Sequence, residues 1–433
     1  MRRWSLDEAL AWLADHVNLE TGLPERLAAP TLDRMIQLSA LSGDPQHAAP
    51  VVHITGTNGK GSTARLISDL LAAHGLDVAT YTSPDLERLN ERLARNGEPV
   101  DDETLVAVLG DIADLEEASG IRPTRFEILT LAAFRWFSDI AADVVVLEVG
   151  LGGIWDATNV ADATVAVVTN VDLDHTLTLG PTRADVAREK AGIVKPSSTL
   201  VLGERDPDLV RLFEAAGPAR LWLQGREFDV ARNGLAVGGR SLDLRTPNAA
   251  YDDVFLSLHG SHQGENAALA LTAAEAFFDR AVTDEVVRAV LGTASVPGRF
   301  EIVARSPLVV LDGAHNPAGA RAAARTLRDF HTGGGVVLVV GMGSERDPIE
   351  MLEALGAGTA RHVVATEAAT PRAMAAGAVA AAARSLGREA EAVPDVAGAV
   401  DRALALATPD DVVLVTGSLY VVGTARAALL RRS

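Results

Sequence analysis

The chain contains no cysteine, few aromatic residues and no long apolar run. Cysteine is absent from all 433 residues, which excludes disulfides, thiolate metal sites and a cysteine nucleophile. Aromatic residues make up 4% of the sequence, so we expect a core of small aliphatic side chains. No run approaches about 18 uncharged apolar residues, and no uninterrupted apolar segment follows the N-terminus, so the sequence predicts neither a membrane span nor a secretory signal. These absences predict a cytoplasmic protein.

Positive charge is also scarce. The chain has 39 lysines and arginines against 58 acidic residues, which gives a formal net charge of −19. Proteins that bind nucleic acid generally present a basic face, so this balance argues against a nucleic-acid partner. An anionic ligand would have to be held by locally concentrated positive groups. A surplus of acid that only keeps the surface soluble is the simpler interpretation of the charge itself.

The length predicts two domains, because a single core rarely grows beyond about 300 residues. In the first part of the chain, short valine-rich runs alternate with helical stretches, which predicts a parallel sheet covered on both faces. We expect strands at Val51–Thr55, Val78–Thr82, Asp143–Val149 and Thr164–Asn170, and helices at Ser62–His74, Asp102–Glu117 and Phe126–Asp139.

The pattern changes twice further along the chain. Scattered glycines and short alternating runs in Leu221–Leu258 predict a small antiparallel excursion, followed by a helix over Gln263–Asp279. Residues 295–299 contain Pro and Gly and predict a linker. After the linker we expect strands at Leu308–Leu311, Val336–Val340, His362–Thr366 and Asp411–Thr416. The prediction is an α/β protein with a P-loop-type, mostly parallel domain over residues 1–294 and a smaller Rossmann-like α/β domain over residues 295–433.

The segment Thr55–Thr63 is rich in glycine and lies between a predicted strand and a predicted helix. Glycines there let backbone N–H groups turn toward an anion, and the helix N-terminus adds partial positive charge. We expect Lys60 to neutralise the β- and γ-phosphates of a nucleotide. The strict P-loop pattern is not matched at either end: Ile54 occupies the position where the pattern requires its first glycine, and Gly61 occupies the position where it requires Ser or Thr. The segment is therefore a variant phosphate loop, and a glycine-rich turn without a ligand is the alternative.

Acidic and imidazole side chains follow two of the predicted strands. Glu148 ends one strand, and Asp172, Asp174 and His175 follow the next. The carboxyl ends of parallel strands meet at one edge of a sheet, and oxygen ligands beside a triphosphate suit Mg²⁺. A loop hydrogen bond is the alternative role for His175. Lys190 lies near the end of a predicted helix, where a lysine is typically a solvated cap contact.

Many such segments occur in a fixed order along the chain. They are Thr55–Thr63, Tyr81–Pro84, Asn90–Arg92, Leu147–Gly153, Asp156–Asn159, Asp174-His175, Glu189–Ile193, Gly260–Gln263 with Asn266, Pro297–Glu301, Leu311–Pro317 and Gly417–Tyr420. Together they resemble the folylpolyglutamate synthase/dihydrofolate synthase family of the Mur ligase superfamily, and the resemblance covers nearly the whole chain.

The resemblance implies an ATP-dependent ligase. ATP phosphorylates the carboxylate of a pteroate or folate, and the amino group of L-glutamate then displaces the phosphate. One Mg²⁺ would be bound by Ser83 and Glu148, and a second by Glu148, His175 and a carbamylated Lys190. The residues that would contact the nucleotide are Thr57, Asn58, Gly59, Lys60, Gly61, Ser62, Thr63, Asn266, Arg299 and Asp312.

The remaining roles implied by the resemblance concern catalysis and the substrates. Lys60, Lys190, His175 and His315 would be the catalytic residues. Asp156, Ser418 and Tyr420 would lie near the folate or the incoming glutamate. By spacing alone, His315 could instead cap the following helix and Tyr420 could belong to the core. A monomer is the family expectation.

The chain departs from the family pattern beside the substrate loops. Bifunctional members commonly have histidine where this chain has Asp85, and Arg-Leu where it has Ile154-Trp155. Both changes remove positive charge near an anionic substrate, so a polyglutamate activity is better supported than a dihydrofolate synthase activity. Two alternatives stay open: a paralogue that joins an amino acid to another carboxylate, and an ATP-binding protein without catalysis.

Overall fold

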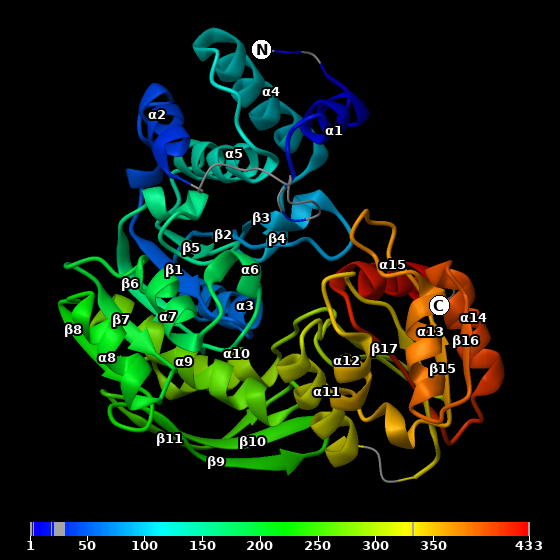
Figure 1. The fold of residues 1–433 in the computed structure, drawn as a ribbon. Coiled ribbons are helices and arrows are strands. Elements are labelled where there is room, and N and C mark those ends of the chain that lie inside the picture. The colour runs from blue at the N-terminus through cyan, green and yellow to red at the C-terminus, as the bar shows by residue number, and fades with distance from the viewer. Residues whose placement is uncertain (1, 3, 19, 21–30, 331–332, 432–433) are drawn as a thin grey trace.

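Two lobes lie side by side in the structure, a computed structural model that describes residues 2, 4–18, 20, 31–330 and 333–431. The larger lobe is built from the first part of the chain and the smaller one from the last part (Figure 1). The chain crosses between them after α10 (Asp284–Gly292) and before β12 (Glu301–Arg305). The predicted linker lies in this crossing, and the predicted architecture of a large and a small α/β unit is confirmed.

The larger lobe contains an eight-stranded sheet in the order β4-β3-β2-β5-β1-β6-β7-β8. Its strands are β1 (Val51–Thr55), β2 (Val78–Tyr81), β3 (Leu93–Arg95), β4 (Glu98–Pro99), β5 (Val144–Glu148), β6 (Ala163–Val168), β7 (Thr199–Leu202) and β8 (Arg220–Leu223). Six neighbouring strands run parallel: β2, β5, β1, β6, β7 and β8. At one edge, β3 pairs antiparallel with β2, and β4 pairs antiparallel with β3. The four strands predicted in this region are confirmed.

Helices cover both faces of this sheet. They are α1 (Leu6–Ala14), α2 (Asp33–Leu41), α3 (Lys60–Ala73), α4 (Asp102–Ser119), α5 (Arg125–Asp139), α6 (Thr176–Leu179), α7 (Arg183–Ala191), α8 (Pro207–Ala215), α9 (Ser261–Phe278) and α10, with 3₁₀ turns η1 (Pro45–His47), η2 (Leu89–Arg92) and η3 (Ala157–Val160). Val144 and Val146 of β5 pack with α3 and α9, whereas Val145 and Leu147 pack with α4 and α5. Burial on both faces explains why the strands are uninterrupted apolar runs.

The antiparallel excursion begins later than predicted. Leu221 belongs to β8, which pairs parallel with β7 at the outer edge of the large sheet. The predicted start at Leu221 was too early because Leu221 and Trp222 pack into the cores on the two faces of the large sheet. The excursion itself is a three-stranded antiparallel sheet that packs against α9 (Figure 1). Its strands are β9 (Asp229–Ala236), β10 (Gly239–Arg245) and β11 (Ala250–Leu256).

The smaller lobe has a six-stranded sheet in the order β12-β13-β17-β14-β15-β16, with β12 antiparallel to β13 and the other pairs parallel. Its remaining elements are β13 (Leu308–Asp312), α11 (Pro317–Phe330), β14 (Val336–Val340), α12 (Pro348–Ala354), η4 (Ala357–Thr359), β15 (His362–Ala365), α13 (Ala376–Ser385), β16 (Ala390–Ala392), α14 (Val396–Leu406), β17 (Val412–Thr416) and α15 (Leu419–Leu430). The four central strands were predicted. The edge strands β12 and β16 were not, because they are only half-buried and lack a continuous apolar run.

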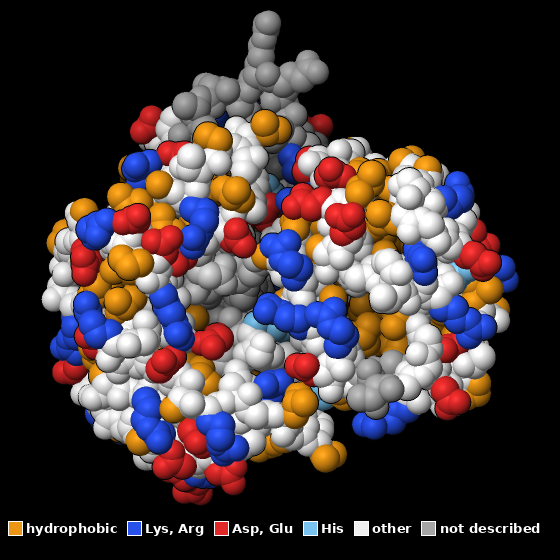
Figure 2. Space-filling view, turned by 60° about the horizontal axis from the view of Figure 1, so that its bottom comes forward, with side chains coloured by type: hydrophobic (Ala, Val, Ile, Leu, Met, Phe, Trp, Pro, Cys, Tyr) orange, Lys and Arg blue, Asp and Glu red, His pale blue; other side chains and the backbone are white. Residues whose placement is uncertain are grey.

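The surface is hollowed between the two lobes, and Lys and Arg side chains gather along one side of this hollow (Figure 2). The positive groups are therefore locally concentrated on an acidic chain. Among the described residues, no helix has the length and apolar character that a membrane span requires.

A histidine lies inside the central strand β1. His53 has no exposed surface, and its Nε2 lies 2.9 Å from Thr158 Oγ1. Burial, with a smaller effect of Lys195, lowers the pKa of His53 to about 3, whereas an unfolded chain has the ordinary value of about 6.5. As the pH falls from 6.5 towards 3, the unfolded chain therefore takes up a proton that the folded chain does not. The stability of the fold decreases through this window.

We expect the variant His53→Gln to lose less unfolding free energy than the wild type when the pH is lowered. Between pH 7 and pH 5 the wild type should lose about 2 kcal/mol more unfolding free energy than the variant. Urea unfolding of both proteins at the two pH values measures the difference. The variant His47→Gln, at an exposed histidine, should follow the wild type. Equal losses in the wild type and His53→Gln would contradict the burial argument.

Candidate active site

The phosphate loop connects β1 to α3 at the carboxyl edge of the large sheet. Gly59, the N-cap of α3, has a φ of +85°, and a Cβ there would lie 2.5 Å from Asn266 Oδ1. Glycine is therefore required both by the left-handed backbone and by the close approach of Asn266 from α9. Asn266 is 5% exposed. The structure thus brings together the loop and a side chain that the sequence placed far away.

The loop is held in place by the turn after β6. The Asn58 backbone N–H donates to Asn170 Oδ1 at 3.0 Å, and its carbonyl oxygen accepts from Thr169 Oγ1 at 2.6 Å. Thr57 Oγ1 donates to the carbonyl oxygen of Asp172 at 3.1 Å. Since the first N–H groups of a helix have no partner within it, the rigid loop directs those at the start of α3 outward as an anion site. The loop residues from Gly59 to Thr63, including the buried Ser62 and Thr63, lie at this start.

A buried carboxylate lies beside the loop. Glu148 ends β5, is 4% exposed, and accepts a hydrogen bond from the Ser83 backbone N–H at 3.1 Å. A Cβ on Gly61 would lie 3.5 Å from Glu148 Oε2, so the first turn of α3 passes directly beside this carboxylate. Burial raises the pKa of Glu148, and Lys60 and Arg299 partly offset the effect. A carboxylate that is desolvated in this way is a suitable cation ligand.

Lys190 lies in the last turn of α7 but is not solvated. It is 3% exposed, so the interpretation of a solvated cap contact was wrong. The helix turns this side chain inward, toward the buried side of the sheet edge. Two effects lower the pKa of Lys190 to about 7: burial is the larger, and repulsion from the charge of Lys60 is the next largest. A large fraction of the amine is therefore uncharged near neutral pH, and an uncharged amine is nucleophilic.

The smaller lobe contacts the larger one beside His175. Arg346 NH2 donates to Asp174 Oδ1 at 2.8 Å, and Asn316 Nδ2 donates to Asp174 Oδ2 at 2.9 Å. His315 Nε2 lies 3.9 Å from the same oxygen. Burial would raise the pKa of Asp174, but His175, Arg346 and His315 outweigh it, so the pKa is lowered. His315 and His175 each have a side chain that is 36% exposed, which leaves both rings accessible to a ligand.

Arg299 and Asp312 lie at the junction of the lobes. Arg299 NH1 donates to the carbonyl oxygen of Gly313 at 3.3 Å. Burial raises the pKa of both Asp312 and Glu148, and the positive charge of Arg299 partly counters this effect. The Asp312 carboxylate accepts from the backbone N–H groups of Phe300 and Ala314 at 3.0 and 2.9 Å. Arg299 therefore lies close to carboxylates of both lobes, which fits a role at the phosphates between them.

The predicted substrate residues lie in two places. Asp156, 3% exposed, caps η3, and its carboxylate accepts from the backbone N–H groups of Thr158 and Leu151 at 3.0 and 2.9 Å. Ser418 is the N-cap residue of α15, in the smaller lobe. Tyr420 is half-buried. Burial is the main reason why the pKa of its hydroxyl is raised, and the negative charge of Glu20 raises it further.

The Asp85 carboxylate shares a buried arginine with Glu20. Arg92, 2% exposed, donates from Nε to Asp85 at 2.6 Å and from both terminal nitrogens to Glu20 at 2.9 and 2.8 Å. Asp85 is therefore ion-paired, but one guanidinium serves two carboxylates, so the cluster keeps a net negative charge. Ile154, the other departure, has 47% of its surface exposed. The pairing with Glu20 could not be predicted, because Glu20 lies about 70 positions away in a segment without a motif.

The residues predicted to bind metal come from separate elements. Ser83 follows β2, Glu148 ends β5, His175 follows β6 and Lys190 lies in α7. Within residues 31–330 and 333–431, as in the short described N-terminal stretches, no three His, Asp or Glu side chains converge on a common point. A cation here would need further oxygen ligands, and phosphate oxygens and a carbamate on Lys190 are of the kind that Mg²⁺ binds. With these additional oxygen ligands, the donor set fits Mg²⁺.

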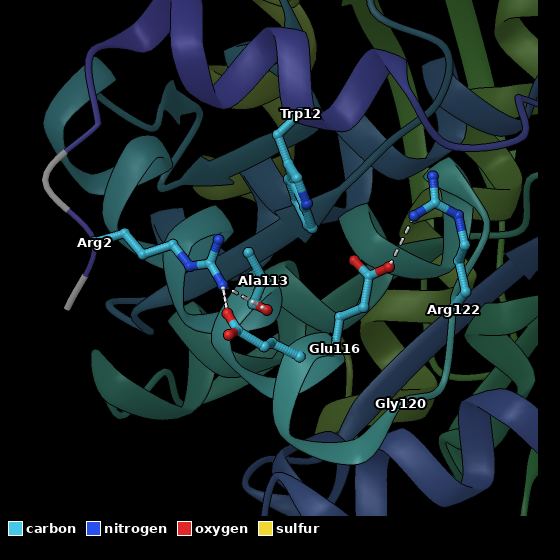
Figure 3. A pocket seen from close by; sticks show the side chains of 7 residues that line it. Arg2, Trp12, Ala113, Glu116, Gly120 and Arg122 are labelled. Atoms are coloured by element: carbon cyan, nitrogen blue, oxygen red, sulfur yellow. Dashed lines mark hydrogen bonds and ion pairs between the residues drawn. The ribbon is translucent and has the colours of Figure 1, made fainter.

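A surface pocket of about 400 Å³ lies elsewhere, between α1 and α4 (Figure 3). Its two guanidinium groups are paired, Arg2 Nε with Asp114 at 2.6 Å and Arg122 NH1 with Glu116 at 3.2 Å. Because its charged groups are mutually neutralised and none of its lining residues belongs to the phosphate loop, this pocket is not the active site.

Gly153 allows α7 to pack against the loop after β5. A Cβ at this position would lie 2.3 Å from the carbonyl oxygen of Glu189. We expect Gly153→Ala to destabilise the protein by about 1–3 kcal/mol, measured as a lower melting temperature. The variant Gly292→Ala is the control, since a Cβ there meets nothing within 4 Å, and it should change stability by less than about 0.5 kcal/mol. Equal stability of both variants would contradict the close packing.

Known proteins are similar to this chain along its whole length. The Mur ligase middle domain matches residues 54–274, and the Mur ligase glutamate ligase domain matches residues 298–419. The dihydrofolate synthase/folylpolyglutamate synthase of Mycobacterium tuberculosis is 37% identical over 469 residues, covering 97% of this chain and 94% of that protein. The folylpolyglutamate synthase of Lacticaseibacillus casei is 32% identical, covering 92% and 94%.

A solved structure agrees with these relatives. Escherichia coli FolC in complex with DHPP and ADP has a TM-score of 0.88 to this chain at 33% identity, covering 100% of this chain and 99% of that one. Similarity over most of the sequence and over the fold of both α/β lobes is thus shared with proteins of one kind. The chain belongs to the folylpolyglutamate synthase/dihydrofolate synthase family of ATP-dependent Mur ligases.

Proposed function

We propose that this protein attaches L-glutamate to the carboxylate of a folate and consumes one ATP for each bond. The observation that supports this most is the meeting of three groups at one sheet edge. A rigid phosphate loop, the buried Glu148 and the buried Lys190 lie there, opposite Arg299, Asp312 and His315 of the second lobe. This is the arrangement that phosphoryl transfer to a carboxylate needs, because charge must be offset on both sides of the transferred group.

The reaction would proceed in two displacements. A carboxylate oxygen of the folate attacks the γ-phosphorus, and the bond to the ADP oxygen breaks, which gives an acyl phosphate. The amino nitrogen of L-glutamate then attacks the acyl carbon, phosphate leaves with the former carboxylate oxygen, and the amine loses a proton. Lys60 and Arg299 would stabilise the negative charge of the transferred group from opposite lobes, and the lobes would keep water from the acyl phosphate.

Mg²⁺ would supply further charge neutralisation, with Ser83 and Glu148 holding one ion and Glu148, His175 and Lys190 a second. The lowered pKa of Lys190 supports a carbamate there. The uncharged amine attacks CO₂, an N–C bond forms and a proton leaves, so that a cation becomes an oxygen ligand. Without that change, Lys190 would offer no oxygen ligand, and its ammonium form would repel a metal ion.

The choice between dihydropteroate and a tetrahydrofolate depends on the residues of the substrate loops. Asp85 and Ile154 stand where bifunctional members commonly have histidine and arginine, and Arg92 restores no net positive charge there because it pairs with Glu20 as well as with Asp85. We infer that tetrahydrofolates with an existing glutamate are better acceptors than dihydropteroate. Asp156, Ser418 and Tyr420 would contact the folate or the glutamate. We further propose a cytoplasmic monomer with its domain boundary between residues 294 and 295.

An assay of ADP release tests the proposal. ATP, Mg²⁺ and L-glutamate are supplied with dihydropteroate, tetrahydrofolate or tetrahydrofolate monoglutamate, each separately. We expect turnover with the tetrahydrofolates and little with dihydropteroate. Turnover that requires a non-folate carboxylate would favour the paralogue, and ATP binding without ADP release under any condition would favour a protein without catalysis.

A further inference from the structure

A buried polar cluster joins the two lobes at the phosphate loop. Asn316, 1% exposed, lies directly before α11 in the smaller lobe. Its Nδ2 donates to Asn58 Oδ1 at 3.0 Å and to Asp174 Oδ2 at 2.9 Å. Its Oδ1 accepts from the backbone N–H of Gly319 at 2.9 Å. One amide of the smaller lobe thus bridges two side chains of the larger lobe.

Both partners of this amide are themselves fixed at functional positions. Asn58 belongs to the phosphate loop, and its backbone is bound to Thr169 and Asn170. Asp174 precedes His175, whose backbone N–H donates to the Asp174 carboxylate at 2.9 Å. A displacement of Asn316 would therefore be felt at the loop and at His175 together.

The amide has no donor left for a ligand. Both Nδ2 hydrogens have acceptors in other side chains, and Oδ1 has a backbone donor. Its removal would leave the buried Asp174 Oδ2 and the half-buried Asn58 Oδ1 short of a donor. The role of Asn316 must therefore lie in positioning.

The lobes have a second, independent contact. Leu86 of the larger lobe packs against the core that contains Val421 and Val422 of α15, and Arg426 of the same helix pairs with Glu87. Together with the pair Arg346–Asp174, this contact should keep the lobes joined when the Asn316 bridge is lost, while the phosphate loop loses its hydrogen bond to the smaller lobe.

We propose that Asn316 is a positioning residue that aligns the smaller lobe with the phosphate loop. In this role it places Arg299 and His315 opposite Lys60, so that phosphate transfer to the carboxylate and capture by glutamate occur in one aligned site. The inference rests on the proposed ligase function.

The variant Asn316→Ala tests the alignment. We expect kcat for glutamate ligation to fall by about 10- to 100-fold, because a small misplacement of reacting groups has such effects, while KM for ATP changes by less than about threefold. The ratio of ADP released to glutamate incorporated should rise above one, because water reaches the acyl phosphate. The control is Asn248→Ala, where an exposed asparagine donates to Glu275 at 3.0 Å far from the site, and it should match the wild type. A kcat within twofold of the wild type in Asn316→Ala would overturn the inference.

A double-mutant cycle with Asn58→Ala identifies the path. If Asn316 acts through Asn58, the double variant should be no more than about twofold worse than the poorer single variant. Multiplicative losses would overturn the inference. If Asn316→Ala fails to fold, Asn316→Ser is used in the same cycle. The cycle is also measured on the free energy of unfolding, which requires no turnover and to which the hydrogen bond between Asn316 and Asn58 contributes. A wild type inactive with every folate would refute the proposed function, whereas additive unfolding free energies in this cycle would overturn the bridge.

Discussion

Replacement of Lys190 by alanine is expected to lower the rate of glutamate ligation by at least about a thousandfold, which corresponds to about 4 kcal/mol of activation free energy. The reason is its position. Lys190 is buried beside Lys60, and its pKa of about 7 leaves much of the amine uncharged and able to form a carbamate. Alanine removes the oxygen ligand that the carbamate would provide and leaves His175 and Glu148 with too few donors for a second cation.

Short carboxylates provide a specific check of this role. Formate or acetate can enter the space left by Lys190→Ala and present oxygen atoms there, so we expect activity to recover at least about tenfold, still below the wild type. Lys195→Ala is the matched control. Lys195 lies five residues further on, and its Nζ donates to a backbone carbonyl oxygen of Asn159 at 3.3 Å, so its loss should leave ligation within a few-fold of the wild type. Wild-type turnover in Lys190→Ala would refute the metal role.

Replacement of Lys60 by alanine is expected to affect two steps together. Its charge lies at the phosphate loop, where its Nζ donates to the carbonyl oxygen of Gly56 at 3.2 Å, and its loss removes a cation from the transferred phosphate. We expect kcat to fall by about a thousandfold or more. Lys60 also lowers the pKa of Lys190. Without it, the pKa of Lys190 should rise, the ammonium form should dominate at neutral pH, and less carbamate should form.

Two measurements separate these effects. Steady-state kinetics give the loss in kcat, and ¹³C NMR of protein equilibrated with labelled bicarbonate gives the fraction of carbamate at pH 7.5. Arg65→Ala is the control, because Arg65 lies further along α3 and is paired with Asp69 at 3.0 Å. It should keep both the kcat and the carbamate signal. An unchanged carbamate signal in Lys60→Ala would contradict the electrostatic coupling of the two lysines, and an unchanged kcat would contradict the phosphate role.

The central strands and the phosphate loop could be predicted from the sequence because their causes are local. The run Val144–Glu148 is apolar on both faces, as a strand between two helical layers must be, and Glu148 at its end necessarily reaches the ligand edge. Gly59 indicates a close approach before its partner Asn266 is known. In these cases the residue type and its neighbours in the chain are sufficient.

Other features depend on contacts between distant segments. Lys190 has the local pattern of a solvated helix end, and its burial results from the packing of α7 against the loop at Gly153. Glu20 binds Arg92 across about 70 positions, and Asn316 binds Asn58 across 258. The edge strand β8 joins the large sheet because its apolar residues find a neighbour in β7. Periodicity cannot reveal such pairings, since each partner alone has an ordinary local explanation.

The central claim is that this site activates a carboxylate as an acyl phosphate before glutamate reacts. The most direct test follows oxygen atoms. A tetrahydrofolate labelled with ¹⁸O in its reacting carboxylate is incubated with the protein, ATP, Mg²⁺ and L-glutamate, and the released phosphate is analysed by mass spectrometry. The account predicts one labelled oxygen in each phosphate formed with an amide bond. Amide formation accompanied by unlabelled phosphate would contradict it.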